Sequence, residues 1–241
     1  MFGKKEPKEE QKPVGGIPFF ISIICLVLIA INNICSLPML IFDRIGTDDF
    51  FSLLQNLIAF ITIAVFSGFI AKFCLKHELA VLVHEFKHRI FAVLVGNKYK
   101  NMKIGKDEGY VVYEYTKKTR IYNALIALAP YYLPLFTIII TGIACIFWWG
   151  NHAAIMTFAA IGYGADFYLG VADIGPHQTD FTNIEGGYYV ALVYVVSINI
   201  CIATSLLAWA FDGLNGLVFL CYGLAHISSF FINTVKNAIF S

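Results

Sequence analysis

The sequence predicts an all-α integral membrane protein, a bundle of about six or seven transmembrane segments with one short membrane-associated β-hairpin. Of its 241 residues, 59% are hydrophobic and only 14% are charged, and the mean hydropathy is +0.72. Soluble domains are about 45–50% apolar and about 25% charged. A soluble core cannot absorb this apolar surface, but lipid can. Apolar runs of about 20 residues recur along the chain, and in lipid they form helices because every backbone polar group then has an internal partner.

Six apolar segments are each long enough to cross a bilayer, which takes about 20 residues. They are residues 17–41, 50–74, 122–149, 153–171, 188–211 and 214–235. A seventh apolar segment, residues 79–96, is interrupted by His84, Glu85, Lys87, His88 and Arg89. Side chains typical of the membrane interface or of helix packing are Tyr131, Tyr132, Trp148 and Trp149.

The predicted segments divide the chain into four parts. Residues 1–16 form a polar tail, residues 17–75 two membrane segments, residues 76–211 a central part, and residues 212–241 a C-terminal membrane helix. The apolar run from Ile17 is longer than the apolar region of a signal peptide, which has roughly 7–15 residues, so we expect an uncleaved anchor. The six cysteines lie singly in apolar segments without a CxxC pair, which indicates packing residues rather than disulfides or a cysteine zinc site.

Basic residues are concentrated in the polar stretch 98–120, which the positive-inside rule places in the cytoplasm. By the same rule, the lysines of the N-terminal tail should also lie in the cytoplasm. If residues 79–96 span fully, three crossings separate the two regions, and both cannot be cytoplasmic. A hairpin in the first two segments, a partial crossing by the histidine-bearing helix, or an outside N-terminus would each remove the conflict, and the sequence leaves these open. The net charge of +1 gives no argument for nucleic acid as a partner.

Two polar stretches separate the apolar segments around the ionisable one. Residues 97–119 contain a run of β-formers at 110–115 (YVVYEY), which together with residues 98–104 predicts a short hairpin. The second stretch, residues 172–187, has acidic residues and a histidine but no lysine or arginine. Its polar candidates are Asp173, His177, Asp180, Asn183 and Glu185.

The strongest chemical signal is the sequence HExxH at residues 84–88. On a helix, positions i and i+4 share a face, so His84 and His88 can bind one zinc ion through ring nitrogens. Glu85 is adjacent and can act as a general base on water without being a ligand. Ionisable groups inside a membrane helix are functional candidates by default. The structural alternative places both histidines near lipid headgroups, with Lys87 and Arg89 extending their charges to the interface.

The region 81–187 resembles the site-2 protease family of intramembrane zinc metalloproteases. LAVLVHEFKHRIFAVLVGNKYKNMKIG is similar to the first core helix of that family and the membrane-associated β-loop that follows it. YNALIALAPYYLPLF resembles the second core helix, with Ala129-Pro130 at a place where the family has a Gly-Pro or Ala-Pro pair. The chain departs from the family pattern at Lys87, where glycine is usual, and at Phe181, where glycine usually follows the aspartate. These departures indicate a divergent member.

The resemblance implies that an aspartate in a third core segment is the third zinc ligand. GPHQTDFTNIEGG offers Asp180 for this role. Asp173 is the main alternative, followed by His177 and Asp166. His177 and Asn183 are also close enough in sequence to hydrogen-bond to the ligands or to a developing oxyanion.

The expected function is therefore that of a zinc metalloendopeptidase that cleaves membrane-embedded or membrane-proximal protein substrates. Zn²⁺ would be held by His84, His88 and Asp180, Glu85 would activate the zinc-bound water, and residues 76–211 would form the protease core. A catalytically inactive scaffold of the same fold and a small ion-coupled transporter that uses the acidic residues as an ion path remain the alternatives. A multi-pass location in a prokaryotic cytoplasmic membrane suits this character, while the oligomeric state is left open.

Overall fold

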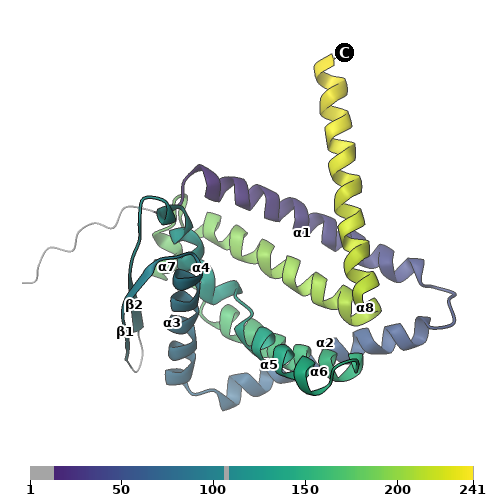
Figure 1. The fold of residues 1–241 in the computed structure, drawn as a ribbon, viewed down its shortest axis with the longest axis horizontal. Coiled ribbons are helices and arrows are strands. Elements are labelled where there is room, and N and C mark those ends of the chain that lie inside the picture. Colours follow the sequence, from purple (N-terminus) through teal and green to yellow (C-terminus); the bar gives the residue numbers. More distant parts are fainter. Residues whose placement is uncertain (1–13, 106–108, 241) are drawn as a thin grey trace, which may run out of the picture.

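The computed structural model describes residues 14–105 and 109–240, with side chains through residue 225. Most of the predicted polar tail therefore lies outside the described residues. The chain is mainly helical, with one two-stranded sheet (Figure 1). Its elements are α1 (Ile17–Asp43), α2 (Phe50–Cys74), α3 (His77–Leu94), β1 (Lys98–Ile104), β2 (Gly109–Glu114), η1 (Thr119–Tyr122), α4 (Asn123–Tyr132), α5 (Leu135–Phe147), α6 (His152–Ala172), α7 (Thr179–Thr182) and α8 (Gly187–Phe240).

Several of these helices are long and apolar enough to cross a membrane, so the chain is a multi-pass membrane protein. Within the described residues they are α1, α2, α6 and the part of α8 over Gly187–Ala225. The pair Thr119–Tyr132 and Leu135–Phe147, bent by 69° at the break between its halves, makes a fifth if it crosses as one span. The predicted number of six or seven segments is therefore not confirmed.

One predicted segment differs from the structure. The apolar run 122–149 does not form one helix, because it breaks at Leu133 and Pro134 into α4 and α5. The two segments 188–211 and 214–235 share the label α8, but the backbone is non-helical at Asp212 and Gly213, so a kink separates them at the predicted boundary. Proline has no N–H to continue the helical ladder, and this accounts for the first break.

The histidine-bearing helix α3 is not among the helices that can cross. In Figure 1, α1, α2 and the first part of α8 run alongside one another, and α3 lies across one end of this bundle. It packs there on α4 and on the hairpin of β1 and β2. The candidate spans between Ile17 and the hairpin are α1 and α2. Two crossings would place the start of α1 and the hairpin on the same side of the membrane.

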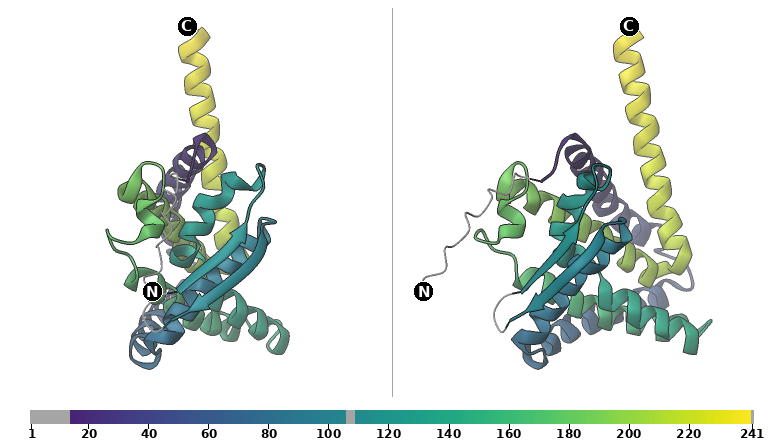
Figure 2. Two further views of the ribbon diagram at one scale, coloured as in Figure 1. Left: turned by 90° about the vertical axis from the view of Figure 1, so that its left-hand side faces the viewer. Right: turned by 60° about the vertical axis from the view of Figure 1, so that its left-hand side comes forward.

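The two ends of the bundle are fixed by separate contacts. At the α3 end, Val14 forms a parallel bridge to Ile184, so the start of α1 lies beside the segment that contains α7. Figure 2 shows the hairpin on this same end of the molecule. At the opposite end, Arg44 Nε donates to Asp212 Oδ2 at 3.0 Å, which ties the end of α1 to the break in α8.

A buried polar cluster joins α1 to α8 inside the bundle. Asn33 Nδ2 donates to Thr204 Oγ1 at 3.1 Å, and Asn32 Nδ2 donates to the Leu220 carbonyl at 3.2 Å. Gly223 permits the close approach, because a Cβ at this position would lie 2.8 Å from Asn32 Oδ1. Small residues and interhelical hydrogen bonds are the usual means by which helices associate in lipid, where apolar burial gives little driving force.

Candidate metal centre

The two histidines of HExxH lie on one face of α3. His84 and His88 are one helical turn apart, and their ring centroids are 5.0 Å from each other in an edge-to-face arrangement. Their side chains are only 15% and 12% exposed. The face that they share is turned toward α4 and the short helix α7. This is the arrangement that the i, i+4 spacing predicts.

Asp180 approaches both histidines from α7. Its Oδ2 lies 3.2 Å from His84 Nε2 and 3.4 Å from His88 Nε2. Within the described residues, one ligand atom from each of these three side chains lies within 4.8 Å of the others. Zinc binds nitrogen and oxygen ligands at about 2.0–2.2 Å, so two tetrahedral ligand atoms are about 3.3–3.5 Å apart. The donor set and its spacing therefore fit a three-ligand zinc site with a fourth position left for water.

The outer ring nitrogen of each histidine is also held. His84 Nδ1 lies 3.2 Å from Asp173 Oδ2, and His88 Nδ1 donates to the Ile126 carbonyl at 2.8 Å. Contacts of this kind fix the tautomer and the orientation of a metal-binding imidazole. Both Nε2 atoms consequently face Asp180. The structure thus places Asp173 behind His84, outside the group of three.

Tyr131 is a site residue that sequence reasoning missed, because it was assigned to packing or to the membrane interface. It is 3% exposed and comes from the end of α4. Its hydroxyl donates to Asp180 Oδ2 at 3.1 Å, and its ring packs edge-on against His84 with the centroids 5.3 Å apart. The only sequence signal for it is its position directly after the Ala129-Pro130 pair.

Glu85 points toward the hairpin and is 7% exposed. The first residue of β2, Gly109, lies directly against it. A Cβ at Gly109 would be 2.6 Å from Glu85 Cγ and 3.0 Å from Glu85 Oε1. A distance under about 3 Å leaves no room for a side chain, so glycine is what lets the hairpin close over this carboxylate.

The hairpin has an inner and an outer face. β1 pairs antiparallel with β2, with Tyr99 opposite Tyr113 and Lys98 opposite Glu114. Burial on the inner face raises the pKa of Tyr113 to about 12. On the outer face, a hydrogen bond from Lys100, whose Nζ lies 2.9 Å from Glu114 Oε1, holds the pKa of Glu114 below its ordinary value.

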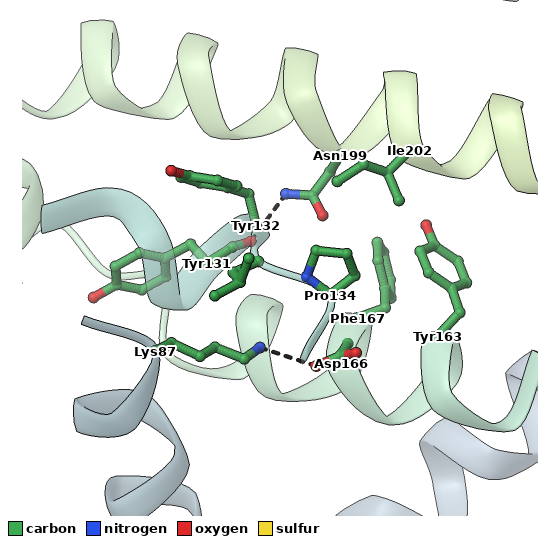
Figure 3. A pocket seen from close by; sticks show the side chains of 10 residues that line it. Lys87, Tyr131, Tyr132, Pro134, Tyr163, Asp166, Phe167, Asn199 and Ile202 are labelled. Carbon is green, nitrogen blue, oxygen red and sulfur yellow. Dashed lines mark hydrogen bonds and ion pairs between the residues drawn. The ribbon is translucent and has the colours of Figure 1, made fainter. Parts of the chain in front are cut away.

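Lys87, which stands where the resembling family has glycine, points away from the three clustered side chains. It is 1% exposed, and its Nζ lies 3.0 Å from Asp166 Oδ1 of α6 (Figure 3). Asp166 therefore neutralises the lysine and is not drawn into the group with His84. An adjacent carboxylate removes most of the repulsion that the ammonium would exert on a nearby cation.

The two remaining candidates do not join the group. His177 is exposed on the turn between α6 and α7. Asn183 follows α7, and its backbone carbonyl accepts a hydrogen bond from the Val14 N–H at 2.9 Å. Its observed contact thus holds the N-terminal segment against the α7 turn.

Comparison with known proteins gives a family match. The model of the peptidase M50B-like family matches residues 55–171, which contain α3 with its HExxH sequence, the hairpin, α4 and α5, and nearly all of α6. The matched region ends before Asp173 and Asp180. No curated protein and no solved structure matches the chain. The resemblance to the site-2 protease family is thereby confirmed over residues 55–171.

Proposed function

We propose that the protein is a zinc metalloprotease that hydrolyses peptide bonds of membrane-embedded or membrane-proximal proteins at the α3 end of the bundle. One observation supports this most directly: His84, His88 and Asp180 converge with separations of 3.2 and 3.4 Å, as a tetrahedral zinc site requires. The family match supports the same reaction class.

The roles of the residues follow from their positions. His84, His88 and Asp180 would hold Zn²⁺, which when bound supplies a Lewis acid for the peptide carbonyl and for water. Glu85 takes a proton from water as the water oxygen forms a bond to the carbonyl carbon. When the C–N bond breaks, Glu85 returns that proton to the leaving amine. Gly109 lies directly against Glu85, so it restrains the Glu85 side chain and excludes bulk solvent from one side of it.

The charge distribution supports a cytoplasmic position for the site. The turn between α1 and α2, at the opposite end, carries one basic residue, Arg44, and the acidic Asp48 and Asp49. The α3 end carries the basic side chains of the hairpin region, which are Lys98, Lys100, Lys103, Lys117, Lys118 and Arg120. By the positive-inside rule the α3 end faces the cytoplasm. The scissile bond would then lie near the cytoplasmic end of a substrate span.

The hairpin is the element best placed to bind substrate. In the part of the chain that the structure describes, β1 and β2 pair only with each other, so each strand keeps one edge without a strand partner. A locally unwound substrate could pair with such an edge through main-chain hydrogen bonds, which is a general mode of peptide recognition. Because Gly109 of β2 touches Glu85, a peptide added to this hairpin would lie close to the general base.

The proposal is tested with purified protein in liposomes that contain a single-span substrate. Wild type should hold about one zinc per chain, as a three-ligand site implies, and should cleave the substrate. Glu85→Gln should keep its zinc and lose cleavage, because the amide cannot accept the proton. Glu78→Gln, in the exposed first turn of the same helix, is the matched control and should cleave normally. Wild type without zinc and without cleavage would refute the proposal and favour a non-catalytic scaffold. Full cleavage by Glu85→Gln would refute the role of Glu85 as the general base.

A further inference from the structure

One ion pair and one hydrogen-bond contact join α3 to α6 and to the residue that follows it. Lys87 Nζ lies 3.0 Å from Asp166 Oδ1, and His84 Nδ1 lies 3.2 Å from Asp173 Oδ2. His84 and Lys87 are three residues apart on α3, and positions three apart on a helix are surface neighbours. Asp166 lies in α6 and Asp173 directly follows it. These side chains therefore connect α3 to α6 and its C-terminal end at two points, of which only the His84 contact involves a candidate ligand.

The Lys87–Asp166 ion pair also holds the break between α4 and α5. Pro134 has no N–H, so the Pro130 carbonyl has no helical donor, and Lys87 Nζ lies 3.4 Å from this oxygen. On the other side of the break, the Thr137 N–H at the start of α5 donates to Asp166 Oδ2 at 2.8 Å, and the Thr137 hydroxyl donates to the same oxygen at 2.9 Å. A cation thus lies at the C-terminus of α4 and an anion at the N-terminus of α5, which are the signs that helix dipoles favour.

Within the described residues, Lys87 and Asp166 form an ion pair with each other and with no other charged side chain. Lys87 is 1% and Asp166 6% exposed. The cavity beside them has a volume of about 10 Å³ and is lined in part by Tyr131, Pro134 and Asn199 (Figure 3). This is room for at most one water molecule. A buried charge that loses its partner is strongly destabilising, so both side chains are confined to the observed contact.

We propose that Lys87 and Asp166 are a positioning pair for the metal centre, an inference that rests on the proposed function. The pair fixes the break in α4–α5, and the residue next to Pro130 is Tyr131, whose hydroxyl contacts Asp180. Because Lys87 lies between His84 and His88 in the sequence, the pair also fixes the part of α3 whose histidines face Asp180. Loosening the pair would therefore move Tyr131 relative to Asp180 and turn α3, although neither Lys87 nor Asp166 contacts the zinc-binding atoms.

The test compares Lys87→Met, Asp166→Asn and the double variant with wild type. Lys100→Met is the matched control, because it removes a lysine from an ion pair on the exposed face of the hairpin. Zinc affinity is measured by competition with a chelator, and the visible spectrum of the Co²⁺-substituted protein reports the coordination geometry. Amide exchange across residues 131–137 is followed in the metal-free proteins.

Both single variants should bind zinc about 10- to 100-fold more weakly, the range found when groups that orient metal ligands are lost. The double variant separates positioning from stability. Replacing both charges by neutral groups commonly restores stability, but methionine cannot donate to the Pro130 carbonyl. We therefore expect a folded double variant with zinc affinity still at least about 10-fold below wild type and an altered Co²⁺ spectrum, while Lys100→Met matches wild type in both.

A folded double variant with wild-type zinc affinity and an unchanged Co²⁺ spectrum would overturn the inference, because the pair would then contribute stability alone. If wild type itself bound no zinc, the proposed function would fail. Amide exchange would still test whether the Lys87–Asp166 pair holds the α4–α5 break in place. Faster amide exchange at residues 131–137 in Lys87→Met than in Lys100→Met would support the inference that the pair stabilises the α4–α5 break. Equal exchange in these two variants contradicts it.

Discussion

The contact between Asp173 and His84 allows a quantitative test of how the candidate ligands are held. Asp173→Asn keeps the size of the side chain and an oxygen that can accept a hydrogen bond, but it removes the negative charge 3.2 Å from His84 Nδ1. A carboxylate in this position makes the imidazole a better metal ligand, and loss of such a partner lowers metal affinity about 10- to 100-fold. The Asp173 side chain is 36% exposed, so solvent already screens part of its charge.

The expected loss is therefore at the lower end of that range, about tenfold in zinc affinity or about 1.4 kcal/mol. Asp180→Asn should behave differently, because it replaces a carboxylate whose oxygen lies against both histidines. We expect its zinc content to fall to the background level. The assay is chelator competition at neutral pH, followed by elemental analysis of the protein after gel filtration.

Asp212→Asn is the matched control, since it breaks the ion pair with Arg44 at the far end of the bundle and should leave zinc affinity unchanged. The reversed result, zinc lost in Asp173→Asn and kept in Asp180→Asn, would refute the assignment and make Asp173 the third ligand. An Asp173→Asn affinity within twofold of wild type would show that the contact with His84 does not tune the ligand.

Two further predictions concern catalysis and stability. Gly109→Ala should keep zinc but lower kcat about 10- to 100-fold, because its Cβ would displace the Glu85 side chain. The control is Gly142→Ala, whose added Cβ would meet nothing within 4 Å. An unchanged kcat for Gly109→Ala would contradict the close contact between Gly109 and Glu85. Removing zinc with a chelator should lower the thermal midpoint of wild type, since a ligand at 100 times its Kd contributes about 2.7 kcal/mol. The same treatment should leave His84→Ala unchanged, and a shift in that variant would place the stabilising metal elsewhere.

The parts of the fold set by local sequence were predicted closely. The second membrane helix begins and ends where the apolar run 50–74 does, and β1 coincides with residues 98–104. The break at Leu133 and Pro134 was missed, because it lies inside an uninterrupted apolar run and proline is common within membrane helices. Whether residues 79–96 cross the membrane was left open, since hydropathy does not report how a helix is tilted.

The candidate site was predictable only where its residues are close in sequence. His84 and His88 follow from the helical period alone. Tyr131 and Asp180 are 49 residues apart, and Lys87 and Pro130 are 43 apart. Contacts of this kind depend on where a helix breaks and on how two helices cross, which no local pattern records. Lys87 departs from the glycine of the family pattern, and its partner Asp166 lies in another helix, so no local pattern shows how the lysine charge is neutralised.

The buried amides of α1 have a consequence for how the protein is made. Asn33 hydrogen-bonds to Thr204, which comes 171 residues later in the chain, and Asn32 hydrogen-bonds to Leu220, which comes 188 residues later. At about 5–20 residues per second of translation, these partners emerge about 9 to 38 s after the asparagines. During this interval the two amides lack their contacts with α8 and have only the hydrogen bonds within α1, from Asn32 Nδ2 to Asn33 Oδ1 and from the Ser36 hydroxyl to Asn32 Oδ1. The contacts that join α1 to α8 therefore form only after every residue of the proposed metal centre has been synthesised.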